Sequence, residues 1–158
     1  MNIVADFTKN WENWEHITFY SNIIKKIGNP KNIGDKAKLV IAYYKKYILS
    51  EYCGYGGLLK AISYLNVIIV KYPKETIFYI ARATIYEHLS NYRSALDDCD
   101  RVLNIDPNCS EALYKKLKIM FILNCGDIKP ILKKLQLVCP MYATKEKEIN
   151  KYFKKKAK

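Results

Sequence analysis

Apolar and small residues recur at helical spacing in front of three prolines, Pro73, Pro107 and Pro140, which lie 34 and 33 residues apart. In each preceding stretch, three such side chains are separated by three or four residues, so they share one face of a helix. The three sets are Ala61, Leu65 and Ile68; Ala95, Cys99 and Val102; and Ile128, Leu132 and Leu135. A fixed period in the thirties predicts stacked helical hairpins.

Capping and helix-breaking residues predict six helices in this part of the chain, whereas no Asn-Gly or Asp-Gly turn indicates a β-hairpin. Asp35, Ser110 and Asp127 are the predicted N-caps of three of these helices. Pro130 falls in a first turn, where its missing N–H is tolerated. The predicted helices cover about residues 35–50, 58–71, 75–89, 92–104, 110–123 and 127–137. The pattern therefore predicts an all-α fold.

Two further segments flank these helices. Residues 8–27 are predicted to form a helix or a broken helix, in which Trp11 and Trp14 share a face. We expect this tryptophan pair to cover the open end of the helical array, with an exposed partner site as the alternative. The predicted organisation is an N-terminal helical cap (1–34), three hairpins (35–73, 74–107 and 108–140) and a basic C-terminal helix or tail (141–158).

The segment 76–109 resembles a tetratricopeptide repeat. Arg82 stands where that family usually has leucine, and the other positions of the pattern are matched by Tyr79, Ala83, Tyr86, Ala95, Cys99, Val102 and Pro107. The units on either side are weaker copies. The resemblance implies an α-solenoid of about three hairpins, in which small residues such as Ala83 and Ala95 allow close helix crossings.

The same resemblance implies a concave groove that binds an extended peptide of a partner protein. The residues carried over to this groove are Ile77, Ile80, Thr84, Glu87, Glu111, Tyr114, Lys115, Lys118 and Phe121. Their mixed character favours a peptide with acidic residues, unless the C-terminal helix covers the groove or these residues are merely solvated. A co-chaperone role is a further alternative. Lys115 fits the expected carboxylate site, but Ala81 and Glu111 stand where asparagine and lysine are expected.

The formal net charge of +12 favours an anionic partner, although only three of the 27 basic residues are arginine and codon bias is a competing explanation. The lysines of the tail, with Lys151, Lys154, Lys155 and Lys156 as the main candidates, would contact phosphates of RNA or a ribosome. The alternative is a solvated capping helix. An RNA- or ribosome-associated factor is therefore the second functional hypothesis.

Residues with catalytic or metal-binding potential are scattered. The five cysteines show no paired spacing, and His16 and His88 stand apart from them, so we expect no metal site, no cofactor and a reducing compartment. Cys99 and Cys139 are predicted as small buried side chains. Asp97, Asp98 and Asp100 are expected on a solvated outer face. No catalytic motif is recognisable.

The apolar segments are too short to cross a bilayer, and no secretory signal is evident at the N-terminus. We therefore expect a non-enzymatic adaptor or scaffold in the cytoplasm, or alternatively in the nucleus, that binds a protein partner or docks in a larger complex. No membrane and no small-molecule substrate are expected.

Overall fold

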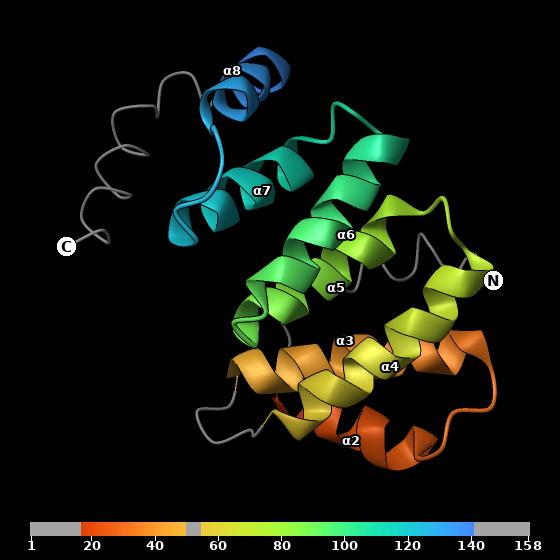
Figure 1. Cartoon of the computed structure of the whole chain (residues 1–158). Helices are drawn as coiled ribbons and strands as arrows, with labels where there is room; N and C mark the ends of the chain where they lie inside the picture. The colour runs from red at the N-terminus through yellow and green to blue at the C-terminus, as the bar shows by residue number, and fades with distance from the viewer. Residues whose placement is uncertain (1–16, 50–54, 141–158) are drawn as a thin grey trace.

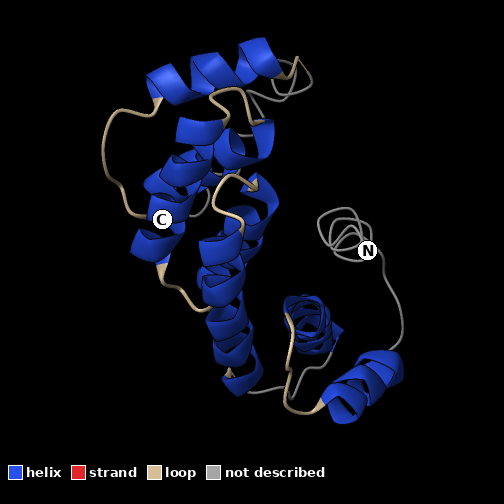
Figure 2. Ribbon diagram, turned by 90° about the vertical axis from the view of Figure 1, so that its right-hand side faces the viewer, coloured by secondary structure: helices blue, strands red, loops and turns tan. Residues whose placement is uncertain are grey.

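The structure is a computed structural model that describes residues 17–49 and 55–140. The described part of the chain is helical and contains no strand (Figure 2). Its helices are α2 (Ile17–Ile27), α3 (Ile33–Leu49), α4 (Gly56–Lys71), α5 (Thr76–His88), α6 (Tyr92–Ile105), α7 (Ser110–Ile122) and α8 (Lys129–Val138). Trp11, Trp14 and the helix predicted in the C-terminal tail lie outside the described residues.

Each described helix packs against the next one along the chain, from α2 on α3 to α7 on α8. Figure 1 shows α3 with α4, α5 with α6, and α7 with α8 as successive pairs, coloured from orange to blue. This side-by-side succession of helices is the architecture of an α-solenoid. The predicted fold class is therefore confirmed.

The spacing of the three prolines recurs in the backbone hydrogen bonds at the ends of α4, α6 and α8. The residue before each proline donates its N–H to the carbonyl four residues earlier: Tyr72 to Ile68 (2.9 Å), Asp106 to Val102 (2.8 Å) and Cys139 to Leu135 (2.9 Å). All three donors have φ between −126° and −135°, outside the helical region. A proline disfavours the helical conformation of the residue before it, which explains these common helix ends.

The ends of α5 and α7 also share one geometry. Ser90 has a φ of +55° and Asn124 a φ of +49°, both left-handed. The next residue in each case donates its N–H to a carbonyl five residues earlier, Asn91 to Tyr86 (2.9 Å) and Cys125 to Met120 (3.0 Å). With the bonds from Ser90 to Glu87 and from Asn124 to Phe121, both turns are Schellman motifs, placed 34 residues apart.

Small buried residues lie where helices cross, as predicted. Ala83 and Ala95 are fully buried and pack with Cys99 and Ile119 in one cluster that joins α5, α6 and α7. A larger cluster fills the space between α3, α4 and α5, and a smaller one joins α7 to α8. These clusters share no single centre but follow the stack of helices, because each helix buries side chains against both of its neighbours.

The start of α3 differs from the prediction. Asn32, not Asp35, is the capping residue: its Oδ1 accepts the Asp35 backbone N–H at 2.8 Å, and its Nδ2 donates to the Asp35 carboxylate at 2.9 Å. Asp35 occupies the third position of the helix, where its carboxylate accepts from the Asn32 side chain rather than from the Asn32 backbone N–H of a capping box. At the starts of α7 and α8, Cys109 and Ile128 hold the N-cap positions predicted for Ser110 and Asp127, and neither makes a side-chain cap bond. Asp127 still satisfies the first backbone N–H of α8, because its Oδ1 accepts from Lys129 N at 3.0 Å.

Candidate protein-binding surface

Three of the predicted groove residues meet between α5 and α7. The Glu87 carboxylate lies 3.0 Å from Lys115 Nζ through Oε2 and 3.1 Å from Lys118 Nζ through Oε1. Glu87 and Lys115 are mostly buried, whereas the Lys118 side chain is 35% exposed. One carboxylate against two ammonium groups leaves a local charge of +1, and Lys118 is the group that solvent or a partner reaches.

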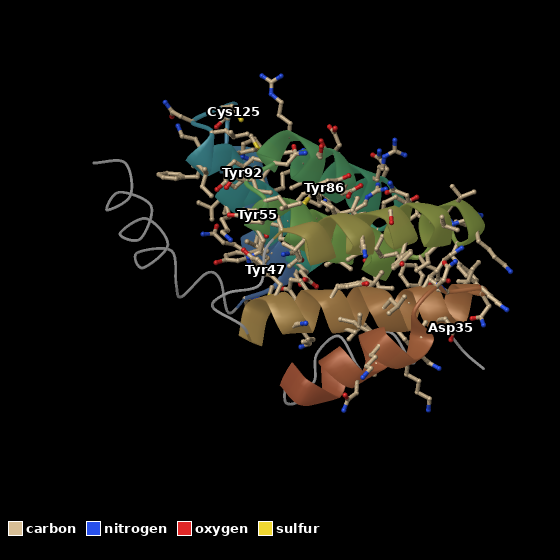
Figure 3. All side chains as sticks on the ribbon, turned by 90° about the horizontal axis from the view of Figure 1, so that it is seen from below. Asp35, Tyr47, Tyr55, Tyr86, Tyr92 and Cys125 are labelled. Atoms are coloured by element: carbon tan, nitrogen blue, oxygen red, sulfur yellow. The ribbon has the colours of Figure 1, made fainter. Side chains whose placement is uncertain are left out.

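Aromatic side chains extend this cluster to α3 and to the start of α4. The Tyr44 hydroxyl lies 3.3 Å from His88 Nε2, and the Tyr47 ring meets the His88 ring edge-on with centroids 5.5 Å apart. Tyr55 follows with its ring centroid 6.2 Å from that of Tyr47 (Figure 3). The first helices of three successive pairs therefore contribute to one continuous cluster, which we call the α3–α5–α7 surface: Tyr44, Tyr47, Tyr55, Glu87, His88, Lys115 and Lys118.

Burial sets the protonation of this surface. Burial, aided by the charges of Glu87 and Glu111 and by Tyr47, raises the pKa of Tyr44 to about 12. Burial also lowers the pKa of His88 from 6.5, and the cationic Lys115 and Lys118 act in the same direction against Glu87. Tyr44 and His88 are thus both uncharged at neutral pH, and the charge of the surface resides on Glu87 and the two lysines.

The other predicted groove residues have different positions. Ile80 is 5% exposed and belongs to the core cluster between α3, α4 and α5, so it is not available to a ligand. Thr84 is half-buried and its hydroxyl donates to the Ile80 carbonyl at 2.9 Å. Ile77 is half-buried against the same core, Tyr114 packs against the α7–α8 cluster, Phe121 is half-buried, and Glu111 is exposed.

Sequence reasoning missed Tyr44, Tyr47 and His88. In the sequence, the glycines at 54, 56 and 57 obscure the alignment of α3 with the repeat pattern, whereas the structure begins α4 at Gly56. The sequence nevertheless contained a signal, because aromatic residues gather near the end of the helix predicted over 35–50: Tyr43, Tyr44, Tyr47 and Tyr55.

One of the three aspartates of α6 is placed differently from the prediction. Asp98 was expected on a solvated face, but it is 2% exposed and its carboxylate receives two hydrogen bonds from Arg82, at 2.8 Å and 2.5 Å. Asp97 is exposed, and Asp100 pairs with Lys116 of α7. The burial of Asp98 follows from Arg82, which stands where the resembled repeat has leucine and is a mostly buried cation that needs a carboxylate.

Three further predictions concern the tail lysines, Ala81 and Cys99. Lys151, Lys154, Lys155 and Lys156 lie outside the described residues. Ala81, at an expected asparagine position of a chaperone-tail site, is fully buried. Cys99 is buried as predicted, and burial raises the pKa of its thiol to about 12.

Residues 17–49 and 55–140 hold no group of three or more His, Cys, Asp or Glu side chains placed to bind a metal ion. Within the same ranges, no helix is both long enough and apolar enough to cross a membrane.

Comparison with known proteins gives one partial relative. Over 87 residues the chain is 30% identical to anaphase-promoting complex subunit 3 of Schizosaccharomyces pombe (strain 972 / ATCC 24843). The matched region is 54% of this chain but 13% of that subunit, so the chain spans a small fraction of its relative. No protein-family model matches the chain.

Proposed function

We propose that the chain is a tetratricopeptide-type adaptor or a small subunit of a larger protein complex, and that it binds a segment of a partner on the α3–α5–α7 surface. The observation that carries this proposal is the contact of Glu87 with Lys115 and Lys118. It joins the first helices of two successive pairs on one face, and the Tyr44–His88 contact extends that face to α3.

The likeness to a subunit of the anaphase-promoting complex supports a role within a protein assembly. The 34-residue recurrence of the helix ends and the small residues at the crossings support the tetratricopeptide assignment. The hairpins 35–73, 74–107 and 108–140 are the proposed repeats. The proposed partner segment places an acidic side chain near Lys118 and an apolar or aromatic side chain on Tyr47 and Tyr55, because aromatic faces bind flat rings favourably.

The test compares two lysines of α7 that are chemically identical but pair with carboxylates on different helices. Lys118 pairs with Glu87 on the proposed surface, whereas Lys116 pairs with Asp100 of α6. The full chain is used as bait in the source cell as wild type, Lys118→Gln and Lys116→Gln, and the captured proteins are quantified by mass spectrometry. Both variants lose one positive charge and one ion pair, so they control for each other.

We expect Lys118→Gln to reduce capture of a defined set of proteins about five- to tenfold, the effect of losing a partly exposed charge pair, while Lys116→Gln retains them. A combined variant, Lys118→Gln with Tyr47→Ala, should remove the set entirely. Equal capture by wild type and both Lys118 variants would refute binding on this surface. Capture of ribosomal proteins or RNA alone would favour the second functional hypothesis instead.

A further inference from the structure

A pocket of about 550 Å³ lies between α2 and α3, away from the α3–α5–α7 surface. Figure 3 places Asp35, one of its lining residues, at the opposite end of α3 from Tyr47. The pocket lies within the usual volume range of ligand sites, but it is small for a helix. It therefore suits a few side chains of an extended segment.

The rim of the pocket is cationic. Lys26 of α2, Lys38 of α3 and Lys31 of the connecting loop all line it, and all three are exposed. Within the described ranges, no carboxylate forms an ion pair with any of them. The one acid that lines the pocket, Asp35, already accepts a hydrogen bond from Asn32. Three positive charges against one negative charge leave a local excess of +2, which favours an anionic ligand.

The apolar part of the pocket lining indicates which kind of anion the pocket binds. Ile23 and Ile27 contribute apolar surface, and none of the lining residues is aromatic. Proteins that hold single-stranded nucleic acid combine positive charge with aromatic rings on which bases stack, and this pocket lacks such rings. A carboxylate beside an aliphatic side chain matches both the lysine rim and the isoleucine floor.

We propose that this pocket is a second binding site, which takes an acidic segment of a partner protein with an aliphatic residue next to its carboxylates. The site is independent of the α3–α5–α7 surface and does not rest on the function proposed for it.

The test uses a short fluorescein-labelled peptide of glutamate and leucine, with a glutamine-for-glutamate twin as the ligand control, and measures binding to the full chain by fluorescence anisotropy. The pocket variant is Lys26→Gln with Lys31→Gln and Lys38→Gln. The charge-matched control is Lys71→Gln with Lys74→Gln and Lys133→Gln, three exposed lysines that do not line the pocket. Circular dichroism verifies that both variants are folded.

We expect the pocket variant to weaken glutamate-peptide binding about tenfold, the sum of three partly exposed charge pairs, and the control variant to weaken it less than about threefold through the screened long-range field. Asp35→Asn should tighten binding about twofold, because it removes the one negative charge at the site. A gain of affinity cannot arise from unfolding, so this second variant keeps the test decisive.

Other outcomes would overturn the proposal. Equal losses in the pocket and control variants would mean that binding follows total charge alone. Loss of peptide binding in Lys118→Gln, with no effect of the pocket variant, would place the peptide on the α3–α5–α7 surface. A labelled single-stranded oligonucleotide provides the last comparison. If its binding depends on the three pocket lysines more than peptide binding does, the site takes phosphates rather than carboxylates.

Discussion

Arg82 of α5 and Asp98 of α6 face each other across their helical hairpin, with two hydrogen bonds between the guanidinium and the carboxylate. The remaining arm of Arg82 donates to the Asn66 side chain of α4 at 2.7 Å. One arginine thus links three successive helices. Burial alone would lower the pKa of Arg82, but the hydrogen bond to Asp98 and its charge outweigh this effect and raise the pKa.

We expect Asp98→Ala to lower the free energy of unfolding by about 3–5 kcal/mol, since it leaves a buried guanidinium without its carboxylate. The matched control is the double variant Arg82→Leu with Asp98→Leu, which removes both charges and fills the space with two apolar side chains. Urea denaturation should find the double variant closer to wild type than the single one. A loss below about 1 kcal/mol for Asp98→Ala would show that the pair contributes no more than a surface pair.

His88 predicts a pH dependence of stability. The pKa of His88 in the folded chain is lower than its value of 6.5 in the unfolded chain. Between the folded-state pKa and 6.5, the unfolded chain therefore binds a proton that the folded chain does not. The free energy of unfolding should therefore fall as pH decreases from about 7.5 through 6.5 and level off below the folded-state pKa. His88→Gln should remove this slope between pH 7.5 and 5.5, as measured by urea denaturation at each pH. An unchanged slope would assign the effect to other groups.

Ser90 predicts a stabilising substitution. It holds a left-handed φ of +55°, which costs a residue with a side chain more than it costs glycine. Ser90→Gly should raise the free energy of unfolding by about 0.5–1 kcal/mol, measured by thermal and urea unfolding. Ser94→Gly in the helical part of α6 is the control and should have the opposite sign, because glycine lowers helix stability there.

The cysteines predict a selective labelling pattern. Cys99 is buried and its thiol pKa is about 12, so almost none of it is thiolate at neutral pH. Cys125 is exposed at the end of α7. Brief treatment with iodoacetamide should alkylate Cys125 and leave Cys99 unmodified until denaturant is added, as read by peptide mass spectrometry. Equal labelling rates under native conditions would mean that the α5–α6 crossing opens readily.

The helices themselves were predictable from the sequence, because local chemistry determines where they end. Pro73, Pro107 and Pro140 stop α4, α6 and α8, and the predicted ends lie within a few residues of those observed. Ala83 and Ala95 also indicated where helices cross, because only small side chains permit the close approach of two helices. The N-cap predicted for α3 was wrong. Asn32 and Asp35 both have side chains suited to capping, and only the backbone conformation decides between them.

The site was less predictable because its contacts join residues far apart in the chain. Glu87, Lys115 and Lys118 were all expected in the groove, but nothing in the sequence indicated that Glu87 would pair with both lysines. Asp98 was expected in solvent because the resemblance places the aspartates of this second helix on its outer face. Its burial depends on Arg82, sixteen residues earlier, and this dependence emerges only when α5 and α6 are side by side.

The turns after α5 and α7 have a consequence for how the sequence can diverge. Their closing hydrogen bonds join backbone atoms only, so the residues Ser90 and Asn124 can differ while each turn keeps its hydrogen-bonding pattern within the pairs α5–α6 and α7–α8. The connection between the two helices of a pair therefore depends on peptide geometry rather than on particular side chains. Substitutions at these two turn positions can then accumulate while the course of the chain through the turn is kept.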